Sequence, residues 1–417
     1  MDVFFVLFFI TLVVFLTLSW FYKDILKKDK LKHSVTEPLT PGIGKSVRII
    51  TYEGSIGTDT DAELYNKLIP GSYIAYVDEG HIISHPEVGK KVDINLFIEH
   101  PIGIIYGIET LFPADKHWLM VNYEMLTITR FLRKIDKFIC KTNYSKKLMT
   151  NLLKNKKYNG EIIYTKHTSS DIEPGKKDWN LFVHLAGKSH LKQTEKVLRA
   201  WIDNKGFSEF GNPKLVITCR RGCLNDRINY MLEDFIQYGN KKVHKDYPNI
   251  QVYSMIPNIE YLELQRKAGV YICTSLTEGY GHYLNEGRSV GSVIITVDGP
   301  PMNELVTSEN GILIKPRKKV PISKLIGSQM REGLAFEICS NQVAEAVKKY
   351  YSLSHEEKVE KGKKSREMYL NDTSYLTTIF KALVDKNVNL ENKNSTTEND
   401  FKKYPTRILS KEQVGTP

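Results

Sequence analysis

Two carboxylates, Glu278 and Glu286, stand on either side of an expected helix start, with seven residues between them. Gly279 and Gly281 flank Tyr280 and let the backbone approach a bound group without an intervening Cβ atom. A glycine-bracketed loop that opens a helix directs free backbone amides at its ligand, which suits an anionic group. This spacing predicts a ligand site in which acidic side chains lie beside backbone amides.

The residues around this loop indicate how it is positioned. Residues 274–305 read as a strand end, the loop, a helix over 283–290, a strand over Val293–Val297 and a second loop rich in glycine and proline. Gly291 stands where a helix commonly ends, and the apolar run after it is typical of a buried strand. Open α/β sheets bind ligands at the carboxyl ends of their strands, so we expect the site at that edge.

This stretch resembles a motif of the retaining group 1 (family 4) glycosyltransferases, which have the GT-B architecture of two Rossmann-like domains. The matching residues are Glu278-Gly-Tyr-Gly281, Glu286, Gly291 and Val293-Ile294. The resemblance implies that Glu286 accepts hydrogen bonds from the ribose hydroxyls of a nucleotide sugar and that Glu278 lies by the donor sugar as a catalytic residue. The backbone amides around the loop would face phosphates or sugar hydroxyls: Gly279, Tyr280, Gly281, His282 and Tyr283. Without a ligand, Glu286 reads as an exposed helix carboxylate and Glu278 as a helix cap.

A second cluster, Gly187, Lys188 and Lys192, directly follows the strand expected over 180–186. Gly187 allows a tight turn, and two ammonium groups beside a helix start suit a pyrophosphate. The cluster resembles the Gly-Arg/Lys…Lys-Gly segment of the same family. The alternative is a pair of solvated surface lysines.

The sequence departs from the family pattern at several positions near both clusters. Gln193 replaces a glycine, and His282 and Tyr283 replace a small apolar residue and a proline. Gly287-Arg288-Ser289 replaces a small apolar run. These departures leave open the alternative that the protein binds nucleotide sugars without catalysing a transfer.

Two further loops follow from the resemblance alone. Residues 254–258 end a strand and precede a helix over Ile259–Lys267, and the nucleotide base would lie there, at Pro257. Residues 298–304 resemble a downstream loop whose acid caps the next helix.

The first half of the chain offers strand ends as candidates. Gly54 and Gly57 lie between the first expected strand and a helix, and would face the diphosphate across a cleft. His100 would contact the donor sugar, act as a base, or serve only the fold. Asn122 and Glu124 end a third strand and are candidate acceptor contacts.

Asp59-Thr60-Asp61 matches the D-x-D pattern that binds Mn²⁺ or Mg²⁺ in transferases of the GT-A fold, since paired carboxylates suit hard cations. Here the pattern opens a helix over Asp61–Leu68, where Asp and Thr act as caps. We therefore expect capping, with no metal or other cofactor required.

Short apolar runs alternate with helical segments, which predicts two doubly wound Rossmann-like parallel sheets. The expected strands are Val47–Tyr52, Ser72–Val77, Asp93–Glu99, Trp118–Glu124, Lys137–Lys141, Glu161–Thr165, Asn180–Ala186, Lys214–Cys219, Ile250–Ser254, Val270–Thr274, Val293–Val297 and Gly311–Lys315. The series splits in a polar stretch over 169–179. The expected parts are an anchor (1–22), a linker (23–46), an acceptor-side domain (47–172), a nucleotide-sugar domain (173–352), helices that cross back (353–386) and a disordered tail (387–417).

Residues 3–22 are uncharged and long enough to span a bilayer as a helix. Five lysines follow within ten residues, from Lys23 to Lys32, so the positive-inside rule predicts a single-pass protein with a cytosolic body. A lumenal orientation is the alternative, with glycosylation sequons at Asn143, Asn371 and Asn394.

Composition narrows the function classes. A hydrophobic content of 41% is that of a globular protein, and the net charge of +11 comes mostly from scattered lysines without a nucleic-acid motif. Five cysteines, mostly in apolar runs, favour reduced buried thiols over a disulfide framework. We expect a membrane-anchored glycosyltransferase that moves a sugar from a nucleotide-sugar donor to a glycan, lipid or protein acceptor, with retention of configuration and without a metal ion. A nucleotide-sugar epimerase or hydrolase on the same fold is the second alternative.

Overall fold

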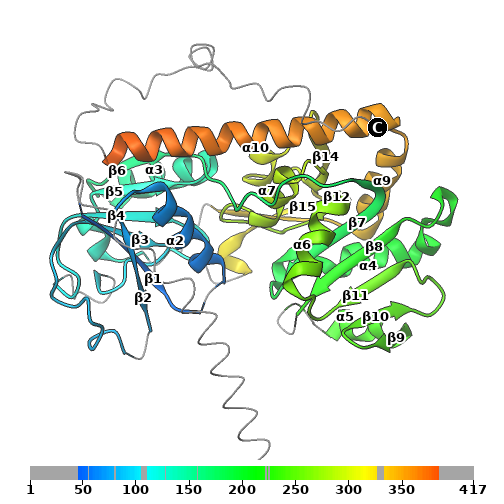
Figure 1. Cartoon of the computed structure of the whole chain (residues 1–417), viewed down its shortest axis with the longest axis horizontal. Helices are drawn as coiled ribbons and strands as arrows, with labels where there is room; N and C mark the ends of the chain where they lie inside the picture. Colours follow the sequence, from blue (N-terminus) through cyan, green and yellow to red (C-terminus); the bar gives the residue numbers. More distant parts are fainter. Residues whose placement is uncertain are drawn as a thin grey trace, which may run out of the picture. The chain divides into compact units, whose positions relative to one another are not determined.

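Two parallel sheets dominate the computed structural model, which describes residues 46–384 apart from 55, 79–80, 105–109, 127, 157, 221–222, 224–225 and 326–332 (Figure 1). Both sheets belong to the unit that begins at Lys45. The anchor expected over 3–22, the linker after it and the tail over 387–417 lie outside the described residues. Within the described residues, no helix is both long and apolar enough to cross a membrane.

The first sheet has six parallel strands in the order β2-β1-β3-β4-β5-β6. The inner strands are nearly continuous apolar runs buried on both faces, which is typical of a parallel sheet covered by helices. Its elements are β1 (Val47–Tyr52), α2 (Ile56–Leu68), β2 (Tyr73–Val77), β3 (Val92–Ile98), β4 (Ala114–Val121), β5 (Lys137–Cys140), α3 (Asn143–Lys156) and β6 (Glu161–Tyr164).

The second sheet has eight strands in the order β14-β13-β12-β7-β8-β11-β10-β9, and only its β11-β10-β9 end is antiparallel. Its elements are β7 (Asp178–Gly187), α4 (Thr194–Asp203), β8 (Lys214–Cys219), α5 (Asp226–Met231), β9 (Phe235–Tyr238), β10 (Lys241–His244), β11 (Ile250–Tyr253), α6 (Asn258–Lys267), β12 (Ala268–Cys273), α7 (His282–Ser289), β13 (Val293–Val297), α8 (Met302–Leu305) and β14 (Gly311–Ile314). A separate hairpin, β15 (Lys318–Pro321) and β16 (Leu334–Glu337), and helix α9 (Ser340–Tyr351) follow.

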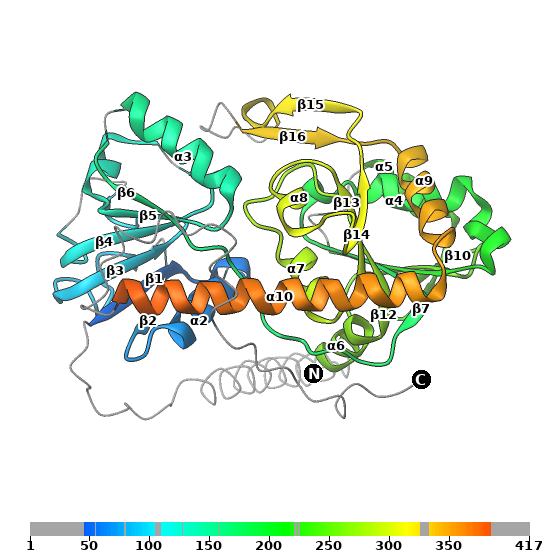
Figure 2. The ribbon, with the colours of Figure 1, turned by 90° about the horizontal axis from the view of Figure 1, so that it is seen from above.

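Helix α10 (His355–Val384) runs alongside both sheets, as the two views in Figures 1 and 2 show. Near its start, Gly362 lies against Gly291, the residue that follows α7 closely. Near its end, Leu376 and Phe380 are fully buried in the core of the first sheet. The last helix therefore packs on both halves of the molecule.

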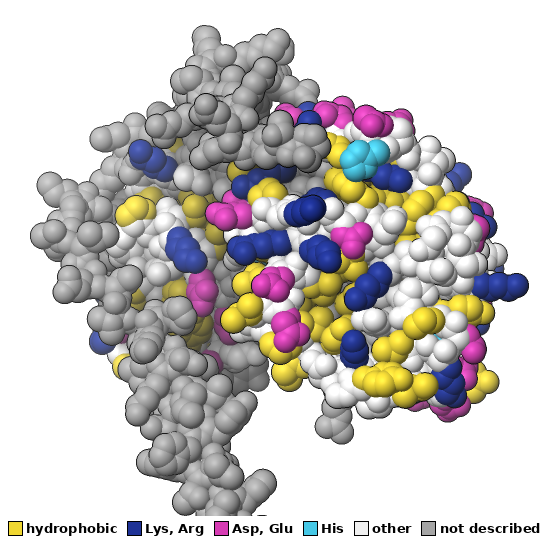
Figure 3. Space-filling model, turned by 45° about the vertical axis from the view of Figure 1, so that its right-hand side comes forward, with side chains coloured by type: hydrophobic (Ala, Val, Ile, Leu, Met, Phe, Trp, Pro, Cys, Tyr) yellow, Lys and Arg dark blue, Asp and Glu magenta, His cyan; other side chains and the backbone are white. Residues whose placement is uncertain are grey.

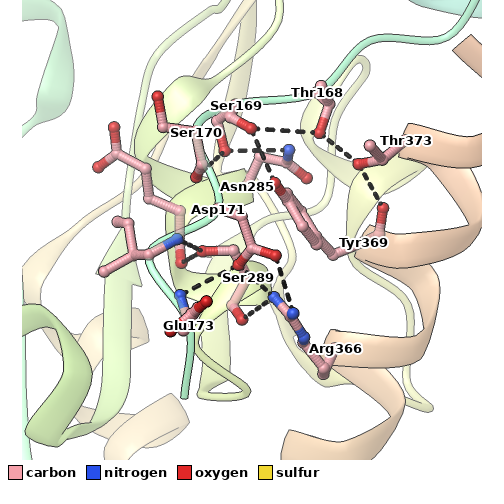
Figure 4. A network of polar contacts seen from close by, with 12 residues as sticks. Thr168, Ser169, Ser170, Asp171, Glu173, Asn285, Ser289, Arg366, Tyr369 and Thr373 are labelled. Carbon is pink, nitrogen blue, oxygen red and sulfur yellow. Dashed lines mark hydrogen bonds and ion pairs between the residues drawn. The ribbon is translucent and has the colours of Figure 1, made fainter. Parts of the chain in front are cut away.

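The polar segment that leads from the first sheet to the second is held by α7 and α10 (Figure 4). Tyr369 donates to the carbonyl of Ser169 at 2.8 Å, and Arg366 forms a two-bond ion pair with Asp171 at 2.5 and 2.8 Å. The amide of Asn285 donates to the Ser169 hydroxyl at 3.2 Å. The polar residues that mark this segment in the sequence thus make specific hydrogen bonds.

The predicted fold class, α/β with two Rossmann-like parallel sheets, is confirmed. All the expected strands are present, most with ends moved by one or two residues, whereas β4 begins at Ala114 rather than Trp118. The antiparallel pairs β9–β10 and β15–β16 were not expected. Their strands are only four residues long, too short to give a clear alternating pattern.

The cysteine and charge expectations have different outcomes. Cys219 and Cys223 form a disulfide with an S–S distance of 2.17 Å, so the expectation of reduced thiols is wrong for this pair. Their Cα atoms lie 5.5 Å apart, within the range that a disulfide requires, because the chain turns directly after β8.

On the face shown in Figure 3, lysines and arginines are interspersed with acidic and apolar side chains.

Candidate functional site

The loops that follow β7 and β12 lie side by side because these two strands are parallel neighbours. The amide of Leu276 donates to the carbonyl of Leu191 at 2.8 Å, and the Thr274 hydroxyl donates to the carbonyl of Lys192 at 2.8 Å. β7 has β8 on its other side, so the strand order reverses here, which is where open α/β sheets bind ligands. The structure thus brings together the two clusters that the sequence singled out.

A cation and an acid meet between these loops. The ammonium of Lys192 contacts the carboxylate of Glu278, and both side chains keep some exposure, 15% and 13%. The Ser275 hydroxyl donates to Glu278 Oε1 at 2.5 Å. Lys192 Nζ also lies 3.9 Å from the ring centroid of the buried Tyr283, a cation–π distance. The arrangement fixes one positive and one negative group at the strand ends.

Helix α7 starts directly at this pair. Gly281 precedes it with a φ of 104°, which side chains rarely tolerate, so a glycine is needed at this turn. The first amides of a helix have no carbonyl partner within it, and they favour an anion. A negatively charged group near Lys192 would therefore meet both an ammonium and the amide end of α7.

Glu286 lies one turn further along α7 and faces α6. Gln265 Nε2 donates to its Oε2 at 2.9 Å. Burial raises the pKa of Glu286, and His282 and Gln265 partly offset that effect. Pro257 is exposed at the start of α6, where its carbonyl accepts from the amide of Tyr261 at 2.8 Å. Glu286 is therefore a partly buried, hydrogen-bonded carboxylate rather than the solvated one of the alternative reading.

The first half reaches the glycine loop through the end of β4. A Cβ atom on Gly279 would lie 2.3 Å from Asn122 Oδ1, so the loop backbone and the Asn122 side chain are in close contact. Asn122 is held there by donating to Glu99 Oε1 at 2.9 Å. Beside it, the hydroxyls of Tyr123 and Thr277 are 3.0 Å apart. Residues from both sheets thus line the Glu278 loop.

Glu124 follows in the same strand end and has an unusual environment. Among the described residues its Oε1 is buried without a hydrogen-bond partner. Burial raises the pKa of Glu124 to about 8, and the nearby Glu278 carboxylate adds to the rise. The raised pKa favours the protonated form of this carboxyl group, which can donate a hydrogen bond.

The remaining predicted residues are not brought to the Glu278 loop by any hydrogen bond within the described chain. Gly54, with a φ of 90°, and Gly57 lie exposed at the turn into α2. The His100 ring lies against Tyr52, with centroids 5.7 Å apart. Lys188 is exposed on the loop after β7.

The expectation that Asp61 caps a helix is wrong. Helix α2 begins at Ile56, so Asp61 lies in its second turn and its side chain is only 1% exposed. Its Oδ1 lies 2.7 Å from His167 Nε2 and 3.1 Å from His282 Nε2, and its Oδ2 accepts from Lys141 at 3.3 Å. Asp59, in the first turn, does stand where an acid favours the helix dipole.

This buried cluster shifts the pKa of each member. Burial alone raises the pKa of Asp61, but Lys141 and the two histidines outweigh it and hold that pKa well below its usual value. Burial lowers the pKa of His167 to about 4. Burial also lowers that of His282, but the Asp61 carboxylate dominates and raises it. Lys141 and His167 were missed in the sequence because their partners are distant along the chain.

Two departures from the family pattern have structural explanations. Gln193 has a φ of 51°, the left-handed conformation that glycine usually supplies. Its amide donates to the carbonyls of Thr274 and Phe336 at 2.9 and 3.0 Å, which ties its loop to its neighbours. Arg288 is fully buried and donates to Asp372 of α10 at 2.7 Å. Both polar replacements are hydrogen-bonded within the fold.

Comparison with known proteins identifies the architecture. No protein-family model and no curated protein sequence match this chain. Among solved structures, the trehalose-6-phosphate synthase OtsA is similar with a TM-score of 0.52 at 10% identity, over 71% of this chain and 72% of that one. A glycosyltransferase from Rickettsia africae ESF-5 has a TM-score of 0.52 at 10% identity, over 82% and 97%.

A chain of the GtfA/B complex has a TM-score of 0.48 at 16% identity. The match covers 69% of the present chain and 56% of the length of that chain. Identities this low establish the fold and leave the substrates open. The chain has the fold of the GT-B glycosyltransferases.

Proposed function

We propose that this protein transfers a sugar from a nucleotide-sugar donor to an acceptor hydroxyl, with retention of the anomeric configuration and no metal ion in the transfer step. The observation that carries the proposal is the meeting of Lys192 with Glu278 at the ends of two adjacent strands, beside the start of α7. A site that offers an ammonium, helix amides and an acid together suits a sugar diphosphate.

The reaction moves negative charge onto the leaving group. The bond between the anomeric carbon and the phosphate oxygen breaks and its electron pair stays on that oxygen. The acceptor hydroxyl bonds to the anomeric carbon on the same face and passes its proton to the departing phosphate oxygen. Lys192, Lys188 and the first amides of α7 are the groups that would neutralise the departing diphosphate. In this role they replace a metal ion.

The remaining residues would bind the two ends of the donor. Glu286, anchored by Gln265, would accept hydrogen bonds from the ribose, and the base would lie by Pro257 at the start of α6. Glu278 would contact the sugar. Asn122 and Glu124, from the first sheet, would face the acceptor side of the same loop.

We further propose that residues 3–22 anchor the protein in a membrane with its body on the cytosolic side. The support is the uncharged length of this segment and the lysines that follow it. Cysteine substitutions at positions on either side of the segment, probed with a membrane-impermeant thiol reagent, would report the orientation.

Product analysis tests the proposed reaction. The full-length chain is incubated with radiolabelled nucleotide sugars, with and without a mixture of glycan and lipid acceptors. Transfer predicts an acceptor-dependent labelled product with the anomeric configuration of the donor. Release of free sugar without an acceptor would indicate a hydrolase, and an isomeric nucleotide sugar would indicate an epimerase.

A further inference from the structure

Three side chains that lie far apart in the sequence, from both halves of the fold and the segment between them, direct nitrogen and oxygen atoms at one another. They are Asp61 of α2, His167 of the segment between the sheets, and His282, the first residue of α7. Their ligand atoms all lie within 4.8 Å of one another. Asp61 Oδ1 is 2.7 Å from His167 Nε2 and 3.1 Å from His282 Nε2.

The outer atoms of Asp61 and His167 have partners that fix their orientation, whereas Nδ1 of His282 is buried without a hydrogen-bond partner among the described residues. Lys141 donates to the other oxygen of Asp61, Oδ2, at 3.3 Å and so leaves Oδ1 to face the imidazoles. The Tyr65 hydroxyl lies 3.1 Å from His167 Nδ1, which turns Nε2 of that ring toward Asp61. Carboxylate and histidine ligands of metal ions characteristically have such partners on their outer atoms.

The charges around the trio leave room for a cation. Asp61 and Glu99 are both acids, and Lys141, whose ammonium lies 3.3 and 3.8 Å from them, is the base between them. With both imidazoles neutral, as metal ligation requires, these groups sum to one excess negative charge in a largely buried place. A bound divalent cation would change this excess from one negative to one positive charge.

We propose that Asp61, His167 and His282 bind one first-row transition-metal ion, with Zn²⁺ the best match. Two imidazole nitrogens and one carboxylate oxygen suit zinc, and hard cations such as Mg²⁺ prefer oxygen alone. Ligands about 2.0–2.2 Å from a tetrahedral ion lie ~3.3 Å from one another. The two separations from Asp61, 2.7 and 3.1 Å, would therefore have to open, and the two histidine nitrogens, which lie within 4.8 Å of each other, would have to come to the same ~3.3 Å separation.

In this position the ion would link three parts of the fold, keep a fourth coordination position open to water, and have an entry route. It would join helix α2, the segment between the sheets and the first residue of α7, three parts of the fold that are distant in sequence. The His282 side chain is 28% exposed, whereas Asp61 and His167 are buried at 1% and 0%. Solvent therefore reaches the trio from the His282 side. The ligand atoms of the ion are side-chain atoms, whereas the proposed transfer uses the backbone amide of His282, so binding of the ion can be tested whether or not the chain transfers sugar.

Cobalt spectroscopy tests the proposal without any substrate. The purified full-length chain is stripped with a chelator, dialysed and titrated with Co²⁺, and Zn²⁺ is then added in competition. We expect visible d–d absorption of low-symmetry cobalt that saturates at one ion per chain and that zinc abolishes. His282→Ala and Asp61→Asn should each lower the cobalt affinity at least ~100-fold, and Tyr65→Phe about 10-fold.

His81→Ala is the matched control, because this histidine is 77% exposed and lies outside the trio, and it should leave the titration unchanged. Far-ultraviolet circular dichroism checks that each variant is folded. A wild-type chain that shows no such absorption and retains no zinc after saturation would overturn the proposal and leave a hydrogen-bonded trio without an ion. Equal affinity in wild type and His282→Ala would overturn it as well.

Discussion

The two halves of the molecule contribute to the Glu278 loop in different ways. The second half supplies side chains from neighbouring strand ends, Lys192 and Glu278, which touch each other directly. The first half contributes Asn122 and Glu124, which reach the loop from the other sheet. In the proposed function, the charged groups for the donor come from one sheet, and the candidate groups for the acceptor come from the other.

This difference suggests that the two halves have different functions. A donor site built within one sheet keeps its geometry whatever the other sheet does, whereas contacts from the first sheet depend on how the two halves meet. Changes in the second half should therefore act on donor binding and on the transfer step. Changes in the first half should act on the contact between the halves and on the acceptor.

Lys192→Ala has the largest expected effect. Removing the ammonium leaves the departing diphosphate without its main side-chain cation, so we expect transfer to fall about 100- to 1000-fold in kcat. Lys196→Ala, a partly exposed lysine of the adjacent α4, is the matched control and should keep the wild-type rate. A Lys192→Ala variant with full activity would remove the donor role from this loop.

Glu286→Ala should weaken donor binding more than it slows the transfer. A lost hydrogen bond to a charged group corresponds to a rise in the donor KM of roughly 10- to 100-fold, with a smaller change in kcat. Steady-state kinetics at varied donor concentration separates the change in the donor KM from the change in kcat. A change confined to the acceptor KM would reverse the assignment of the two halves.

Gly279→Ala probes the contact between the halves. The new Cβ would lie 2.3 Å from Asn122 Oδ1, so we expect a loss of about 1–3 kcal/mol in the free energy of unfolding. Asn122→Ala in the same chain should restore much of that loss, because it removes the atom that clashes. Urea unfolding of the two single variants and the double variant measures the coupling, and purely additive losses would show that the contact is not made.

Glu124→Gln should change the pH dependence of stability. The folded-state pKa of about 8 lies above the usual value of 4.5, so the folded state keeps a proton that the unfolded chain releases. Stability from this group is fully present below pH 4.5 and is lost as pH rises toward 8. The change in Tm caused by Glu124→Gln should therefore be about 3 °C more positive at pH 8 than at pH 5. An unchanged pH profile would show that Glu124 is ionised at pH 7.

Much of the fold follows from local patterns. Short apolar runs such as Val293–Val297 are buried strands whatever their neighbours, so alternation with helices was enough to predict two parallel sheets. The antiparallel strands at one edge, such as β10, lie half-exposed and carry lysines, and no hydrophobic period marks them.

The site was predictable where its residues are close in sequence. The Glu278 loop and the Gly187–Lys192 cluster each form one short motif, and strand order brings them together. Asp61 could not be assigned from its neighbours, because its partners are 80 or more residues away. Glu304 is similar: it accepts from the amides of Asn143 and Tyr144 and so caps α3, a helix of the first half.

The most direct test of this division is a thermal-shift measurement with donors. The full-length chain is screened with UDP-, GDP-, ADP- and dTDP-sugars, since a ligand that binds only the folded state must raise the Tm. At 100 times Kd we expect one nucleotide class to raise the Tm by about 5 °C. At the same donor concentration the shift should fall to about 1–3 °C in Glu286→Ala and stay near 5 °C in Asn122→Ala. No shift with any donor, or a shift lost only in Asn122→Ala, would contradict a donor site in the second half.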